Sequence, residues 1–239
     1  MSVLVLVRHG QASFLQSDYD KLSTLGERQS RMLGSFWAAQ STRFDEVVTG
    51  PRTRQIKTAE LTLESYAGSS PALPSIRVVP EFDEYDSGGV VGILLPQLVE
   101  RDPKVAALAE EYQESKGSPN ERRAFQRIFE VVMKAWIRGE DVPAEVASWQ
   151  EFKARVSQAL ASIIEHNHSG RRVAVFTSGG PICIAVQLAL GLADEKAIEI
   201  NWALRNGSLT EFLFTKDRFT LDTFNCLPHI PDRSLWSYR

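Results

Sequence analysis

The stretch Val3-Leu4-Val5-Leu6-Val7-Arg8-His9-Gly10 joins an unbroken apolar run to a guanidinium, an imidazole and a glycine. A short apolar run of this kind is typical of a strand buried on both faces, as in a parallel sheet. Arg8 and His9 would then follow the carboxyl end of the strand, where open α/β sheets bind ligands. A guanidinium there offers paired donors to phosphate, and an imidazole can act as nucleophile, base or metal ligand. The alternative is a buried strand that simply ends in polar surface residues.

Length and charge limit the class of protein. The 239 residues suffice for one large α/β domain or two small ones, and 43% hydrophobic with 24% charged residues is ordinary for a soluble globular protein. The net charge of −3 does not favour nucleic acid or acidic membranes. No apolar stretch approaches the length of a membrane span. We therefore expect a cytoplasmic protein without nucleic-acid or membrane partners, and the sequence gives no indication of its oligomeric state.

The two cysteines, Cys183 and Cys226, lie far apart, without a CxxC pair or the His spacing of a zinc site. We expect both to be buried thiols in a reducing compartment. No metal site and no cofactor is predicted.

The remaining apolar pattern predicts strands that alternate with helices. Further strands are expected at 46–49, 76–79 and 172–177, and a hairpin at 209–215 and 218–224. Helices are expected from about residue 25, after Pro51, at 149–165 and from Pro181 to Leu190, with Gly191 just beyond the last. This alternation predicts a three-layer α/β/α fold, with a mainly parallel sheet covered by helices on both faces.

A segment of different character interrupts this pattern. We interpret residues 1–239 as a single domain with a largely helical insertion at about 86–147. Gly88 and Gly89 are expected to be flexible, and Ser118 to cap a helix that has Pro119 in its first turn. Later in the chain, Asp194 is expected to cap a further short helix.

Polar groups follow three of the predicted strands. The groups lie in Arg8-His9-Gly10, in 50–54 (Gly-Pro-Arg-Thr-Arg) and in 178–181 (Ser-Gly-Gly-Pro). The second and third groups open helices, whose N-termini favour anions. If the strands are parallel, all three groups meet at one edge of the sheet. Two arginines, a histidine and helix N-termini at one edge predict a phosphoryl site.

These segments resemble a known family. Residues 7–11, Val-Arg-His-Gly-Gln, are similar to the opening motif of the histidine phosphatase superfamily, also called phosphoglycerate mutase-like proteins. Residues 22–29 resemble its Leu-Thr-x-x-Gly-x-x-Gln segment. Residues 49–59, Thr-Gly-Pro-Arg-Thr-Arg-Gln-Ile-Lys-Thr-Ala, resemble Ser-Pro-Leu-x-Arg-Ala-x-Gln-Thr-Ala and align Arg54 with the second phosphate-binding arginine. Residues 82–84 resemble the Leu-x-Glu that supplies a proton donor.

The resemblance implies a role for each matching residue. His9 would be the nucleophile that takes the phosphoryl group, Arg8 and Arg54 would bind its oxygens, and Glu84 would protonate the leaving oxygen, without a metal. Neutralising the phosphoryl oxygens is the main task in such a transfer. Considered without the resemblance, Glu84 is equally well interpreted as a solvated loop acid.

One position departs from the family pattern. Where the superfamily usually has a second histidine, in Ser-His-Gly-Gly, this chain has Ser178. A serine hydroxyl is shorter and neutral, but it still donates one hydrogen bond, and the Gly179 and Gly180 amides offer further donors. The remaining histidines, His166, His168 and His229, are poorly placed to replace it.

Three functions fit these observations. The leading hypothesis is a metal-independent, slow phosphatase that hydrolyses a small phosphomonoester through a phosphohistidine on His9. The alternative is a protein that binds a phosphorylated ligand or partner with impaired catalysis, which Ser178 favours. A phosphoglycerate-type mutase is disfavoured, because residues 11–14 read Gln-Ala-Ser-Phe and no Trp-Asn pair follows.

Overall fold

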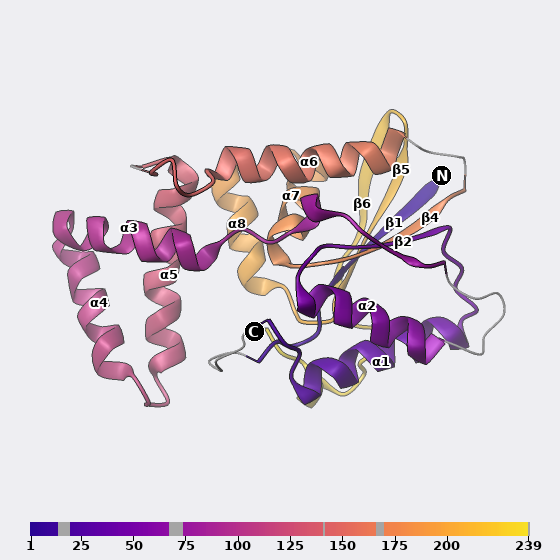
Figure 1. Cartoon of the computed structure of the whole chain (residues 1–239), viewed down its shortest axis with the longest axis horizontal. Coiled ribbons are helices and arrows are strands. Elements are labelled where there is room, and N and C mark those ends of the chain that lie inside the picture. Colours follow the sequence, from indigo (N-terminus) through magenta and orange to yellow (C-terminus); the bar gives the residue numbers. More distant parts are fainter. Residues whose placement is uncertain (14–19, 67–73, 141, 166–169, 239) are drawn as a thin grey trace. The chain divides into compact units, whose positions relative to one another are not determined.

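The structure is a computed structural model that describes residues 1–13, 20–66, 74–140, 142–165 and 170–238 (Figure 1). It contains two compact units. The first comprises Met1–Glu84 and Arg155–Arg239, and the second comprises Tyr85–Ala154. The interpretation of residues 86–147 as an insertion into a single domain stays a prediction. Histidines 166 and 168 lie outside the described residues.

The first unit is built on a mixed six-stranded sheet in the order β3-β2-β4-β1-β5-β6. Its parallel part contains β1 (Ser2–Arg8), β2 (Glu46–Thr49), β3 (Ile76–Val78) and β4 (Arg172–Thr177). The hairpin of β5 (Leu209–Thr215) and β6 (Arg218–Cys226) adds an antiparallel edge, with β5 paired to β1. The predicted α/β class, with its mainly parallel sheet, is confirmed.

The register brings the three predicted junctions to one edge of the sheet. Arg8 lies opposite Thr177, and Thr49 lies opposite Phe176. Strands β1, β2 and β4 therefore end at the same level, and the residues that follow them emerge together.

Helices cover both faces of this sheet. In Figure 1, α1 (Thr24–Ala39) and α2 (Thr53–Tyr66) lie on one side, and α7 (Gly179–Leu190) lies on the other with the C-terminal part of α6 (Trp149–Glu165). Helix α8 (Asp194–Ala203) packs beside α7, and short 3₁₀ turns occupy Pro80–Phe82 and Arg233–Leu235.

The core between the sheet and α1 and α2 follows from the strand alternation. Val5 and Val7 point into it, and Leu4 and Leu6 are buried on the opposite face, as expected for a strand covered on both sides. Trp37 of α1 lies with its ring centroid 4.6 Å from that of Phe44 and 6.0 Å from that of Phe176. This apolar contact holds α1 against the sheet, and α2 packs beside α1.

The second unit is helical. It contains α3 (Ser87–Arg101), α4 (Pro103–Ser115), α5 (Glu121–Arg138) and the beginning of α6. Trp136 of α5 lies at its centre, with ring centroids 5.2 Å from Tyr85 and 5.4 Å from Trp149. Gly139 ends α5 with φ 70°, a left-handed conformation that glycine adopts without strain.

Two predictions in this unit are wrong. Gly88 and Gly89 are not a flexible link: they form the first turn of α3, because the Asp86 carboxylate caps that helix by accepting from the Gly89 amide at 3.0 Å. Helix α5 begins at Glu121, so Ser118 and Pro119 precede it instead of starting it.

Two predictions in the first unit are also wrong. Asp194 does not cap α8, because Ala193 holds that position and the Asp194 carboxylate accepts from the Gln187 side chain at 2.6 Å. Cys183 is buried as expected, but Cys226 is exposed, because it lies at the last position of the edge strand β6.

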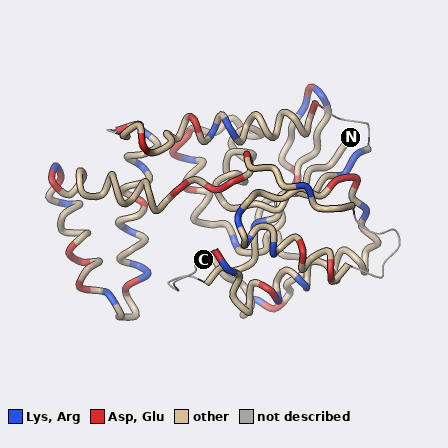
Figure 2. Tube along the Cα trace, viewed as in Figure 1, with Lys and Arg blue, Asp and Glu red and all other residues tan. Residues whose placement is uncertain are grey.

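Basic and acidic residues are interspersed along the described elements, and helices such as α2 and α5 carry both (Figure 2). Of the helices that the structure describes, none is both long and apolar enough to cross a bilayer.

Candidate active site

His9 lies directly after β1, and its orientation is fixed by two hydrogen bonds. Its backbone amide donates to the Thr177 carbonyl at 2.9 Å, and its Nδ1 lies 2.7 Å from the Gly10 carbonyl oxygen. A carbonyl oxygen can only accept, so this contact assigns the ring proton to Nδ1 and leaves a lone pair on Nε2. The Arg54 Nε–H donates to that Nε2 at 3.2 Å.

The surroundings of His9 keep its ring neutral. The side chain is 5% exposed, and burial lowers its pKa well below the usual value of 6.5, with the Arg54 and Arg8 guanidinium groups lowering it further. At neutral pH the ring is therefore an imidazole with an unprotonated Nε2.

Arg8 ends β1 and is buried beside His9. Its Nη1 donates to the carbonyl oxygen of Leu204, which follows α8. Its charge acts on the His9 ring and also on the Cys183 thiol in the second turn of α7.

Arg54 lies in the first turn of α2, where an acid that the sequence reasoning missed accompanies it. The Asp20 carboxylate accepts from Arg54 Nη1 at 2.7 Å and from the Thr53 amide at 2.8 Å. Partial burial opposes ionisation of Asp20, but the Thr53 amide and the Arg54 charge hold its pKa below the usual value. Asp20 belongs to none of the motifs that the sequence analysis identifies.

Glu84 follows the 3₁₀ turn Pro80–Phe82, and its carboxylate lies at the N-terminus of α7. The Gly180 amide donates to Oε1 at 3.1 Å and to Oε2 at 3.2 Å. The expectation that the Gly180 amide would be available to a phosphate is therefore wrong for this structure. The Arg155 guanidinium of α6 fixes the turn by donating to the carbonyl oxygens of Pro80 and Asp83 at 3.2 and 3.1 Å.

Ser178 is fully buried and has a partner that the sequence did not indicate. Its Oγ accepts from Gln55 Nε2 at 2.8 Å. Gln55 is also fully buried, and its Oε1 accepts from the Arg52 amide at 3.1 Å. The only sequence signal at Gln55 was a polar residue where the superfamily motif has alanine. Gly179 opens α7 so close to Asn201 that an added Cβ would lie 1.9 Å from its Oδ1.

The model of one protein family, the histidine phosphatase superfamily (branch 1), matches residues 4–135 and 110–227. The chain belongs to this superfamily. No curated protein matched the sequence.

Solved structures of the superfamily's fold resemble this chain over nearly its whole length. A phosphoserine phosphatase from Entamoeba histolytica, in complex with 3-phosphoglyceric acid, superposes with a TM-score of 0.63 at 18% identity, covering 96% of this chain and 100% of its own. A phosphoglycerate mutase from Bacillus anthracis gives 0.62 at 18% identity, with 96% and 95% covered. An alpha-ribazole phosphatase from Shigella flexneri gives 0.60 at 20%, with 94% and 96% covered. At these identities the likeness shows the fold alone.

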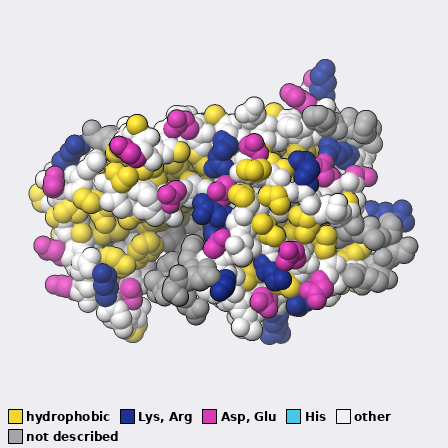
Figure 3. All heavy atoms as spheres, viewed as in Figure 1, with side chains coloured by type: hydrophobic (Ala, Val, Ile, Leu, Met, Phe, Trp, Pro, Cys, Tyr) yellow, Lys and Arg dark blue, Asp and Glu magenta, His cyan; other side chains and the backbone are white. Residues whose placement is uncertain are grey.

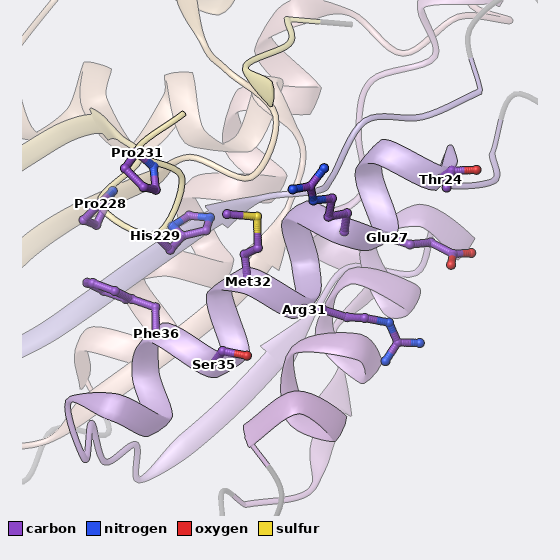
Figure 4. Close-up of a pocket in the computed structure, with 10 residues that line it drawn as sticks. Thr24, Glu27, Arg31, Met32, Ser35, Phe36, Pro228, His229 and Pro231 are labelled. Atoms are coloured by element: carbon purple, nitrogen blue, oxygen red, sulfur yellow. The ribbon is translucent and has the colours of Figure 1, made fainter. Parts of the chain in front are cut away.

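The histidine phosphatase fold of this chain holds a second buried histidine, His229, which lies beyond β6. It lines a shallow cavity of about 720 Å³ together with residues of α1 (Figure 4). Its ring lies 6.2 Å from that of Phe36, and neither ring nitrogen has a hydrogen-bond partner among the described residues. Burial lowers its pKa to about 4. No histidine is visible on the described part of the face in Figure 3, in keeping with the burial of His9 and His229.

Within the described part of the chain, no three His, Cys, Asp or Glu side chains cluster closely enough to hold a metal ion. The candidate site brings together His9, Arg8 and Arg54 at one sheet edge, where Asp20 pairs with Arg54, Glu84 accepts from the start of α7 and Ser178 accepts from Gln55.

Proposed function

We propose that this protein is a phosphatase that hydrolyses a small phosphomonoester through a phosphohistidine on His9, without a metal. The observation that carries the proposal is the state of His9. Its Nε2 bears a lone pair, its ring is kept neutral by burial and by two arginines, and the Arg54 guanidinium lies 3.2 Å from that nitrogen. A neutral imidazole is a nucleophile that attacks phosphorus without losing a proton.

In the first step, the His9 Nε2 lone pair forms the N–P bond while the bond from phosphorus to the ester oxygen breaks. The phosphoryl oxygens accept hydrogen bonds from Arg54 and Arg8, which offset their charge. The leaving oxygen takes a proton and departs as the alcohol. In the second step, water attacks phosphorus, the N–P bond breaks, phosphate leaves, and His9 regains its lone pair.

We propose that Glu84 acts in its protonated form, giving its proton to the leaving oxygen, and that the resulting carboxylate later takes one from the attacking water. Its carboxylate is held by the Gly180 amide at the start of α7, and its charge acts on Cys183, as does that of Arg8. Glu84 and Arg8, one of the two proposed phosphate-binding arginines, thus both act on the same thiol, that of Cys183.

The substrate class is a small phosphorylated metabolite. The resembling structures include a phosphoserine phosphatase and an alpha-ribazole phosphatase, and both names denote small phosphomonoesters. The second candidate function is binding of a phosphorylated ligand without efficient turnover. The observation in its favour is Ser178, a neutral hydroxyl engaged by Gln55.

The test is turnover of a generic phosphomonoester together with trapping of the intermediate. We expect slow release of phosphate and a label on His9 that is lost in acid and kept in base. His9→Ala abolishes both, whereas His229→Leu, which alters the other described buried histidine, keeps both. Full turnover by His9→Ala refutes the mechanism. Phosphate binding without any turnover by the wild type favours the second candidate.

A further inference from the structure

Gln55 links three of the segments that build the site. Its Nε2 donates to Ser178 Oγ at 2.8 Å and lies 3.4 Å from the carbonyl oxygen of Phe82, two residues before Glu84. Its Oε1 accepts from the Arg52 amide at 3.1 Å, at the start of α2. A fully buried amide with all these bonds has a fixed orientation, because turning it over would place like groups together.

The direction of the Gln55–Ser178 bond determines what the serine hydroxyl can do. An amide nitrogen only donates, so Ser178 Oγ is the acceptor in this pair and its own proton is directed elsewhere. No described residue accepts that proton. Ser178 directly follows Thr177, whose carbonyl oxygen accepts from the His9 amide at 2.9 Å. Ser178 therefore follows a strand end that is bonded to the His9 backbone, and it carries a buried hydroxyl proton that no described residue accepts.

Gln55 also fills the space beside Ser178. A Cβ added to Gly50 would lie 2.2 Å from Gln55 Oε1, so glycine at position 50 makes room for this side chain. Gly50 thus leaves room for Gln55, whose amide donates to Ser178 Oγ, and we call Gln55 and Ser178 the amide–hydroxyl pair.

We propose that Gln55 is a positioning residue, which holds Ser178 Oγ as an acceptor so that the serine proton is presented to a phosphoryl oxygen at His9. This inference rests on the proposed function only in placing the phosphoryl group at His9. Position 178 has no imidazole, and the Ser178 hydroxyl, held by Gln55, supplies the hydrogen-bond donor there instead. Gln55 itself need not touch the phosphoryl group.

The experiment is a double-mutant cycle between Gln55→Met and Ser178→Ala, since methionine approximately keeps the volume of glutamine but lacks the donor. The readouts are orthovanadate binding, which reproduces the five-coordinate phosphorus of the transition state, and turnover of a generic phosphomonoester. Each single variant should weaken vanadate binding roughly 10- to 100-fold, the worth of one hydrogen bond to a charged group. The double variant should be no weaker than Ser178→Ala alone.

The control is Gln187→Met, which alters another buried glutamine about 13 Å further along α7. It should leave vanadate affinity unchanged. If Gln55→Met does not fold, Gln55→Glu serves instead: an ionised carboxylate at that position accepts from Ser178 and withdraws its proton, so it should weaken vanadate binding to the level of Ser178→Ala.

The proposal is overturned if the double variant loses vanadate affinity by the product of the two single losses, because a merely structural glutamine would act independently of Ser178. Unchanged vanadate affinity in Gln55→Met also overturns it. Coupled effects on vanadate binding, found in a wild type without turnover, uphold the positioning role and refute the phosphatase. Turnover that depends on His9, without coupling between Gln55 and Ser178, upholds the phosphatase and refutes the positioning role.

Discussion

Replacing His229 with leucine should make the protein more resistant to acid. The imidazole is 5% exposed, and neither ring nitrogen has a partner among the described residues, so protonation in the folded state would bury an uncompensated charge. Burial accordingly lowers the pKa of His229 to about 4, from the usual value of 6.5. Leucine fills a similar volume and does not titrate.

The sign and size of the effect follow from proton linkage. Between pH 6.5 and about pH 4 the unfolded chain binds a proton at His229 that the folded chain does not bind. The free energy of unfolding therefore falls as the pH falls toward 4. The contribution of the neutral His229 to the free energy of unfolding is fully present above pH 6.5. Between about pH 7.5 and about pH 5, its loss amounts to about 2 kcal/mol.

The measurement is urea unfolding of the wild type and of His229→Leu at those two pH values. The free energy of unfolding of the wild type should fall by about 2 kcal/mol more than that of the variant, because the other titrating groups, His9 included, are common to both proteins. Circular dichroism at neutral pH checks that the variant is folded. Equal losses in the two proteins would show that His229 gains a proton in the folded state as easily as in the unfolded chain.

Two further predictions concern packing. Ser178→His alone should lower the free energy of unfolding, because Gln55 occupies the adjacent space, and Gln55→Ala in the same chain should restore it in urea melts; equal stability of both variants contradicts this. Gly34→Ala should lower the free energy of unfolding by roughly 2–4 kcal/mol, because the alanine Cβ would lie 2.1 Å from the Thr62 carbonyl oxygen. Gly92→Ala, whose Cβ would have no neighbouring atom within 4 Å, should instead raise it by up to about 1 kcal/mol by stabilising α3.

The elements that place the site could be predicted because buried strands leave a strong signal. The run 3–7 and the runs at 46–49 and 172–177 contain apolar residues without alternation, and each corresponds to a strand of the parallel part of the sheet. Parallel strands end at one edge, so Arg8, His9 and Arg54 could be assigned to that edge from the sequence. The proximity of His9 and Arg54 in the structure follows from this register.

The bonds between side chains could not be predicted, because they join residues far apart in the chain. Nothing in the spacing of Gln55 and Ser178 indicates that an amide of α2 reaches a hydroxyl before α7. Asp20 likewise belongs to no motif of the sequence, although it pairs with Arg54. Helix starts were misplaced for a local reason: several polar residues near each start could act as caps, and their competition is decided by backbone geometry.

The position of β1 within the sheet has a consequence for folding during synthesis. This first strand pairs on one side with β4 and on the other with β5, so both neighbours are made more than 160 residues later. At about 5–20 residues per second, a ribosome takes roughly 10–40 s to reach β5 after β1. Until β4 is made both edges of this apolar strand lack their native neighbours, and until β5 is made one edge still does, which is the condition that favours pairing with other chains. A nascent chain stalled before residue 209 should therefore depend on chaperones to stay unaggregated.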